Sequence, residues 1–241
     1  MPSFEPWQWL LGAFSAFVIG VAKTGAPGLG TLIAPLMVIV VGDARLATAW
    51  ALPVLITADI FAVWYWRRKA EAKQLFSLAP WVLAGIVGGA LALGLPEIAI
   101  RRMLGVIVLA MMFIYLRRRF RPAAKVHGSP PFYGLATGFS STVANAAGPV
   151  MNLYLLSRDL PKEEFVATGA WFFLSLNLAK VPVYAYHGLY SPSSLTYDAM
   201  MIPMVLCGAL TGRWVVRVMP QKLFEFLVIA LTGVSCVLLF L

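Results

Sequence analysis

Long apolar blocks, most of them close to the length that crosses a lipid bilayer, restrict this chain more than any other feature of its sequence. Eight of them follow one another, with short polar segments between them. They cover roughly residues 7–41, 46–66, 76–95, 100–116, 132–157, 165–186, 195–215 and 223–241. A helix needs about 20 apolar residues to cross a hydrocarbon core of about 30 Å. The sequence therefore predicts an all-α, polytopic membrane protein.

Composition excludes several other classes. Of the 241 residues, 61% are hydrophobic and only 12% are charged, too few charges to cover a soluble domain of this length. The formal net charge of +9 comes mostly from short loops, where membrane topology explains it, so no nucleic-acid partner is expected. Cys207 and Cys236 lie in apolar segments without metal-ligand spacing. We therefore expect no metal, no cofactor and no disulfide framework.

The first and fifth blocks are interrupted by helix-breaking residues. "TGAPGLG" divides the first block, and "SSTVANAAGP" divides the fifth. Inside a bilayer every backbone amide needs a hydrogen-bond partner, so non-helical backbone survives there only where protein or a water-filled cavity surrounds it. Both breaks are therefore expected to line a binding site.

Basic residues predict the topology. Placing "RRKAEAK", "RRRFRPAAK", "RDLPKEE" and the segment with Arg213, Arg217 and Lys222 in the cytoplasm puts 14 of the 19 Lys and Arg residues inside, three outside and two within blocks. This distribution agrees with the positive-inside rule. The fifth block then starts and ends inside, and the first starts and ends outside, so each is predicted to be a re-entrant hairpin. Both termini are predicted outside, in a multi-pass protein of the cell inner membrane or plasma membrane.

The same topology predicts two inverted repeats, each a broken hairpin plus three transmembrane helices. The first repeat covers residues 1–120 with its hairpin at 7–41, a basic cytoplasmic linker covers 121–131, and the second repeat covers 132–241 with its hairpin at 132–157. A shift of about 120 residues places Gly28 on Gly148, "ATAW" on "ATGAW" and one "GAL" on the other. This common offset, about half the chain, supports an internal repeat.

Residues at the two breaks are suited to binding an anion. Half-helix N-termini carry free N–H groups and a partial positive charge, glycines let backbone approach a ligand, and hydroxyl and amide groups replace part of its hydration shell. The alternative is that small residues permit close helix packing and that Ser and Thr bond their own backbone. The candidate binding residues are Lys23, Thr24, Gly25, Gly28, Gly30 and Thr31 in the first hairpin and Ser140, Ser141, Thr142, Asn145 and Gly148 in the second.

Three charged residues lie well inside predicted spans, where burial is expensive. Lys23 is expected either to contact the anion or to extend to the membrane interface. Asp59 and Lys180 occupy equivalent positions when "ATAW" is aligned with "ATGAW". They are predicted to be either a structural ion pair or a proton-linked switch. On this reading Asp59 is the single carboxylate deep in a span.

Two motifs resemble those of the sulfite exporter TauE/SafE family. They are "GxxKTGxPGxGTLxxP" at 20–35 and "GxxSTxANAAGP" at 138–149, and the length and the two four-element halves fit as well. The resemblance implies a secondary transporter of sulfite, sulfoacetate or other sulfonates, with the paired motifs at the substrate site. It fixes neither the anion nor the direction of transport.

Other functional classes fit less well. A hydrolase would need a nucleophile and base, paired aspartates or a zinc motif, none of which the spans contain, so the protein is not expected to be an enzyme. An anion channel on the same inverted repeat remains the alternative. The working hypothesis is an alternating-access carrier that binds a small anion between opposed half-helices, with a proton as possible coupling ion. Its oligomeric state is left open.

Overall fold

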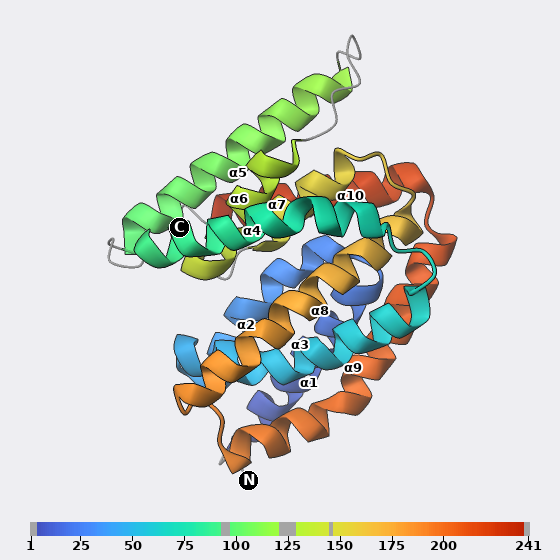
Figure 1. The fold of residues 1–241 in the computed structure, drawn as a ribbon. Helices are drawn as coiled ribbons and strands as arrows, with labels where there is room; N and C mark the ends of the chain where they lie inside the picture. The colour runs from blue at the N-terminus through green and yellow to red at the C-terminus, as the bar shows by residue number, and fades with distance from the viewer. Residues whose placement is uncertain (1–3, 93–96, 121–128, 145–146, 239–241) are drawn as a thin grey trace. The chain divides into compact units, whose positions relative to one another are not determined.

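The computed structural model describes residues 4–92, 97–120, 129–144 and 147–238, so most of the predicted linker lies outside it. Within these ranges the chain forms ten α-helices and one short 3-10 helix, confirming the all-α class (Figure 1). The elements are α1 (Pro6–Thr24), η1 (Pro27–Leu32), α2 (Ile33–Val41), α3 (Ala44–Trp66), α4 (Ala72–Ala92), α5 (Glu97–Phe120), α6 (Pro130–Ala144), α7 (Ala147–Leu156), α8 (Lys162–Tyr186), α9 (Pro192–Val218) and α10 (Gln221–Leu238).

Local sequence signals set several helix ends. Gly42 ends α2 in the left-handed conformation, with φ of 81°, and the side chain of Asp43 then accepts a hydrogen bond from the Leu46 amide at 2.8 Å to start α3. Ser191 and Ser194 form a reciprocal capping box before α9, with bonds of 2.9 and 3.1 Å. These caps satisfy amides that would otherwise lack partners.

The first interrupted block is broken where the sequence predicts, into α1, η1 and α2. In the second, α6 ends at Ala144 and α7 begins at Ala147, and the residues between them, 145–146, lie outside the described ranges. α2 has nine residues and α7 has ten, so each is only about 15 Å long. That is half of a hydrocarbon core, as expected for half-helices.

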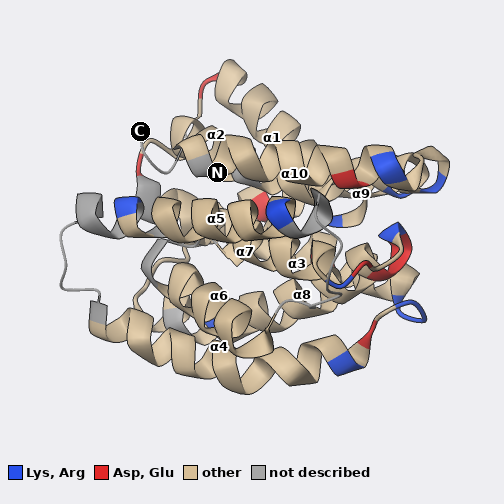
Figure 2. Ribbon diagram, turned by 90° about the horizontal axis from the view of Figure 1, so that it is seen from above, with Lys and Arg blue, Asp and Glu red and all other residues tan. Residues whose placement is uncertain are grey.

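Four helices among the described residues are long and apolar enough to cross a membrane. They are Leu46–Trp66, Ala72–Leu91, Lys162–Tyr186 and Pro192–Val218. The continuous apolar part of α5 is shorter, Gly105–Arg117, and the last predicted span extends beyond the described residues. Figure 2 shows that many charged residues lie at helix ends and in connecting segments, while long stretches of the helices are uncharged. This distribution is that of a multi-pass membrane protein.

The chain divides into two compact units, and each contains elements from both predicted repeats. Unit 1 consists of Met1–Ala70 and Lys162–Phe224, and unit 2 of Glu71–Pro161 and Glu225–Leu241. The units therefore do not coincide with residues 1–120 and 132–241. The inverted repeat remains a prediction about sequence equivalence.

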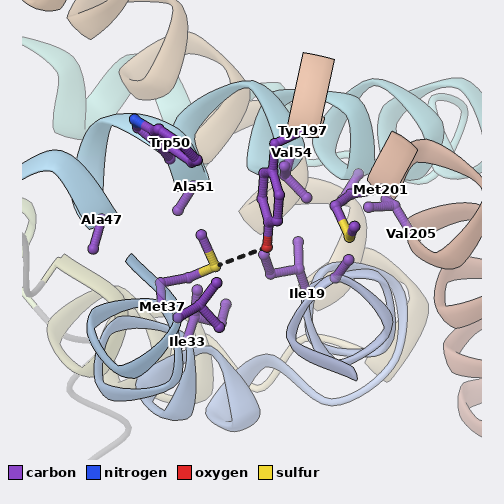
Figure 3. Close-up of a cluster of buried hydrophobic side chains, with 13 residues drawn as sticks. Ile19, Ile33, Met37, Ala47, Trp50, Ala51, Val54, Tyr197, Met201 and Val205 are labelled. Carbon is purple, nitrogen blue, oxygen red and sulfur yellow. Dashed lines mark hydrogen bonds between the residues drawn. The ribbon is translucent and has the colours of Figure 1, made fainter. Parts of the chain in front are cut away.

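In unit 1, α1 packs most extensively on α9. Glycine makes the crossing possible: a Cβ on Gly20 would lie 2.2 Å from the Val205 carbonyl oxygen, and one on Gly208 would lie 2.1 Å from that of Phe17. Beside this crossing, Tyr197 is buried against Trp50 and donates a hydrogen bond to the Met37 sulfur at 3.8 Å (Figure 3). α1, α2, α3 and α9 share this core.

In unit 2, α4 and α6 pair in the same manner. A Cβ on Gly138 would lie 2.1 Å from the Val82 carbonyl oxygen, and one on Gly85 would lie 2.3 Å from that of Leu135. Under the 120-residue shift, α6 is the counterpart of α1 and α4 is the counterpart of α9. Both units thus pair a helix that precedes a break with a helix from the other half of the chain.

Candidate functional site

An ion pair lies at the first break, inside unit 1. Lys23 is in the last turn of α1, where a cation is favoured by the helix dipole. Its Nζ is 2.9 Å from Oδ1 of Asp59, in the second half of α3. The side chain of Asp59 is 0% exposed and that of Lys23 is 13% exposed. Lys23 therefore points into the protein beside the break and does not extend to a membrane interface.

α8 completes the surroundings of this pair. Asn177 donates a hydrogen bond from Nδ2 to the second carboxylate oxygen of Asp59, Oδ2, at 2.7 Å. The ring of Phe173, one turn earlier on α8, has its centroid 4.4 Å from the Lys23 ammonium. Three helices, α1, α3 and α8, thus supply the charge, its counter-ion and their lining.

Lys180 belongs to the same cluster. It follows Asn177 by three residues, so both lie on one face of α8. It is close enough to interact electrostatically with both Asp59 and Lys23. We call Lys23, Asp59, Asn177 and Lys180 the charged centre.

The predicted site residues of the first hairpin have different surroundings. Thr24 is fully buried, and its hydroxyl is directed at the carbonyl oxygens of Gly20, at 2.9 Å, and Ala209, at 2.8 Å. A Cβ on Gly25 would lie 2.3 Å from the Gly212 carbonyl oxygen. Both residues thus serve the crossing of α1 and α9, which is the packing alternative recognised from the sequence.

Gly30 is more open. A Cβ there would meet only the Ile33 side chain, at 3.9 Å. Gly28 and Thr31 belong to η1 with Gly30, although the Thr31 side chain lies outside the described part. A methyl group would therefore fit at Gly30 in η1, whereas at Gly25, after the end of α1, it would not.

In unit 2, the hydroxyls before the second break are mostly bonded to their own helix. Ser140 donates to the Thr137 carbonyl oxygen at 3.1 Å, and Thr142 to that of Gly138 at 2.9 Å. Ser141 is 6% exposed and has no such bond within the described part of the chain. In the aligned motifs it occupies the position of Lys23.

After this break, nothing within 4 Å would obstruct a Cβ on Gly148. Asn145 lies outside the described residues. Within this hairpin, Gly148 is therefore the described candidate with open surroundings, whereas Ser141 is buried.

Sequence reasoning missed Asp198. The sequence places a single carboxylate deep in a span, but Asp198, on α9, is 6% exposed and is a second buried one. The seventh apolar block begins at residue 195, so the sequence alone places position 198 near the end of a span. The helix begins at Pro192, and packing on α1 and α3 buries its first turns.

Comparison with known proteins identifies one family. The model described as "Sulfite exporter TauE/SafE" matches residues 11–239. No curated protein and no solved structure matches the chain. The matched range includes both motifs, at 20–35 and 138–149, and the whole charged centre.

Proposed function

The chain belongs to the sulfite exporter TauE/SafE family, and we propose that it is a secondary carrier whose anion binds at the charged centre of unit 1. The family consists of membrane transporters of sulfite and related sulfur anions, and the apolar helices fit a multi-pass membrane protein. Sulfite, sulfoacetate and other sulfonates are the proposed substrates. Alternating access is the proposed mechanism, with exposure of the centre changing between the two sides of the membrane.

One observation carries the proposal: the Lys23 ammonium lies beside a helix break, 2.9 Å from the Asp59 carboxylate, and the Lys23 side chain keeps 13% exposure. An oxyanion that reaches this ammonium would replace Asp59 as its partner. Gly30 leaves space at the adjoining η1, where backbone N–H groups would assist.

Neutralisation of Asp59 is proposed to control binding. While Asp59 is ionised, it competes with the substrate for Lys23. When it gains a proton, Asn177 still holds the carboxyl group in place, and Lys23 is released to the anion. In this mechanism Asp59 and Lys180 remain the proposed coupling pair. Lys23 is the direct ion-pair partner of Asp59.

The test is transport by purified protein in proteoliposomes. Sulfite, sulfate and a sulfonate series are supplied to wild type, Lys23→Ala and Lys69→Ala. Lys69 is a matched control because its side chain is 56% exposed and its contact with Glu163, at 3.6 Å, is a surface ion pair. We expect Lys23→Ala to lose affinity for the anion and Lys69→Ala to behave as wild type. Unchanged affinity in Lys23→Ala would show that the anion binds elsewhere.

Counterflow distinguishes the carrier from the alternative channel. A carrier exchanges labelled for unlabelled anion and saturates as concentration rises. Currents that exceed one conformational cycle per ion would favour the channel. A parallel measurement with Ser141→Ala examines the second hairpin.

A further inference from the structure

Asp198 is a buried carboxylate that the proposed anion site does not use. It is 6% exposed, and neither of its oxygens has a hydrogen-bond partner within the described part of the chain. An unpaired ionised carboxylate is energetically expensive in such surroundings, so a group of this kind binds a proton instead. α9 positions it about 9 Å from the helix start at Pro192. That end of α9 is the one predicted to face outside.

The helices around Asp198 supply no described charge that would hold it ionised. α1 and α3 pack against α9, and their charged residues are Lys23, Arg45 and Asp59. Lys23 and Asp59 pair with each other, and the Arg45 side chain lies outside the described part. On α9 itself, the next charged residue is Arg213, about 22 Å along the helix.

Titratable neighbours of Asp198 are phenols. Tyr197 precedes it on α9, but its hydroxyl is directed at the Met37 sulfur. Tyr190, in the loop before α9, has a buried hydroxyl without a hydrogen-bond partner in the described structure. Partial burial, with Tyr184 and Asp198 nearby, raises the pKa of Tyr190. Its phenol therefore stays protonated and carries no charge that acts on Asp198.

We propose that Asp198 is a proton-binding site near the start of α9, an inference that rests on the proposed anion transport for its coupling role. Its two oxygens are buried without a hydrogen-bond partner in the described part of the chain, so the carboxyl group is held there in its protonated form. Asp198 takes its proton from water when this end of α9 is exposed to it and returns the proton to water, so no other group changes its protonation. Anion accumulation driven by a pH gradient then requires Asp198 to bind that proton.

A metal cation fits this position less well than a proton. Oxygen-ligated cations take six or more oxygens. The described side chains offer the Asp198 carboxylate and the Tyr190 hydroxyl, while helical carbonyls are already bonded within α9. A proton needs one carboxylate only.

The first experiment compares two kinds of transport by wild type, Asp198→Asn and Asp159→Asn in proteoliposomes. Asp159 is an exposed aspartate in a loop at positive φ, which asparagine tolerates, so it is the matched control. With sulfite as the probe, Asp198→Asn is expected to lose accumulation driven by a pH gradient and to keep exchange of labelled for unlabelled sulfite at equal pH. Gradient-driven accumulation that survives in Asp198→Asn overturns the proposal.

The second experiment does not depend on transport. Infrared difference spectra of the wild-type protein are expected to show the carbonyl band of a protonated carboxylic acid, and Asp198→Asn is expected to lack it. If Asp198→Asn has lost sulfite exchange as well, the infrared band still tests the proton site. A band that is present in wild type and absent in the variant supports the site. A band that is absent in wild type refutes it. If wild type transports no anion, the proposed function fails while the band still reports the proton site.

Discussion

Replacing Asp59 with asparagine separates a binding centre from a structural ion pair. Asparagine keeps the shape of the carboxylate and its contact with Asn177 but removes the charge that holds Lys23 at 2.9 Å. If the pair is only structural, the variant loses folding stability and its affinity for the anion does not rise. If Lys23 binds the anion, the same change removes the Asp59 carboxylate, which competes with the anion for Lys23.

The magnitude follows from the geometry. Breaking a buried ion pair by removing one partner typically costs about 3–5 kcal/mol of folding stability. A bound anion and the Asp59 carboxylate, both touching one ammonium, would lie about 5 Å apart and repel by about 3 kcal/mol at an effective dielectric constant of about 20. Removing that repulsion corresponds to roughly a hundredfold tighter binding.

The assay is thermal unfolding of the purified protein in detergent over a sulfite titration. Without sulfite, we expect Asp59→Asn to unfold at a lower temperature than wild type. A ligand stabilises the folded state once its concentration exceeds the Kd. We therefore expect sulfite to raise the unfolding temperature of Asp59→Asn at lower concentrations than it does for wild type. Asp159→Asn is again the control. Stabilisation of Asp59→Asn at the same or higher sulfite concentrations than wild type would refute a role for Lys23 in binding.

Three further substitutions distinguish packing from binding. Gly138→Ala is expected to lower the unfolding temperature, because its Cβ would lie 2.1 Å from the Val82 carbonyl oxygen. Gly148→Ala, whose Cβ would have nothing within 4 Å, is expected to leave the unfolding temperature unchanged and to weaken anion binding. Equal unfolding temperatures of the two variants would contradict this contrast. Thr24→Val removes the hydrogen bond to the Ala209 carbonyl oxygen. It is expected to lower the free energy of unfolding, measured with a chemical denaturant, by about 1 kcal/mol and to change substrate affinity little. A large loss of affinity would show that Thr24 belongs to the binding site.

The fold was largely predictable because each of its signals is local. Apolar blocks of bilayer length, and Gly and Pro within two of them, predict helices and breaks from a few neighbouring residues. The helix pairs were not predictable in this way. The contacts of Gly20 with α9 and of Gly138 with α4 join residues more than 50 positions apart, and a glycine alone does not name its partner.

The candidate site was predictable in composition and not in pairing. Lys23, Asp59 and Lys180 were all identified as charges inside spans, but equivalence in a repeat joins Asp59 to Lys180 only by position. The direct partner of Asp59 is Lys23, because the last turn of α1 lies against α3 in unit 1. Asn177 carries no charge and belongs to no sequence pattern, although it donates a hydrogen bond of 2.7 Å to Asp59.

The charged centre finally predicts how proton and anion are linked. A proton on Asp59 and an anion on Lys23 each weaken the ion pair between these residues, so each favours the other, and the coupling is the same in both directions. Sulfite affinity is therefore expected to rise as pH falls, and proton and anion are expected to move together across the membrane. Asp59→Asn imitates the protonated form, so its affinity should be high and nearly independent of pH. Affinity measured across a pH series in wild type and in this variant checks the linkage. A second test is the direction of proton movement in unbuffered proteoliposomes, where movement of protons opposite to the anion would mean that Asp59 does not couple the two.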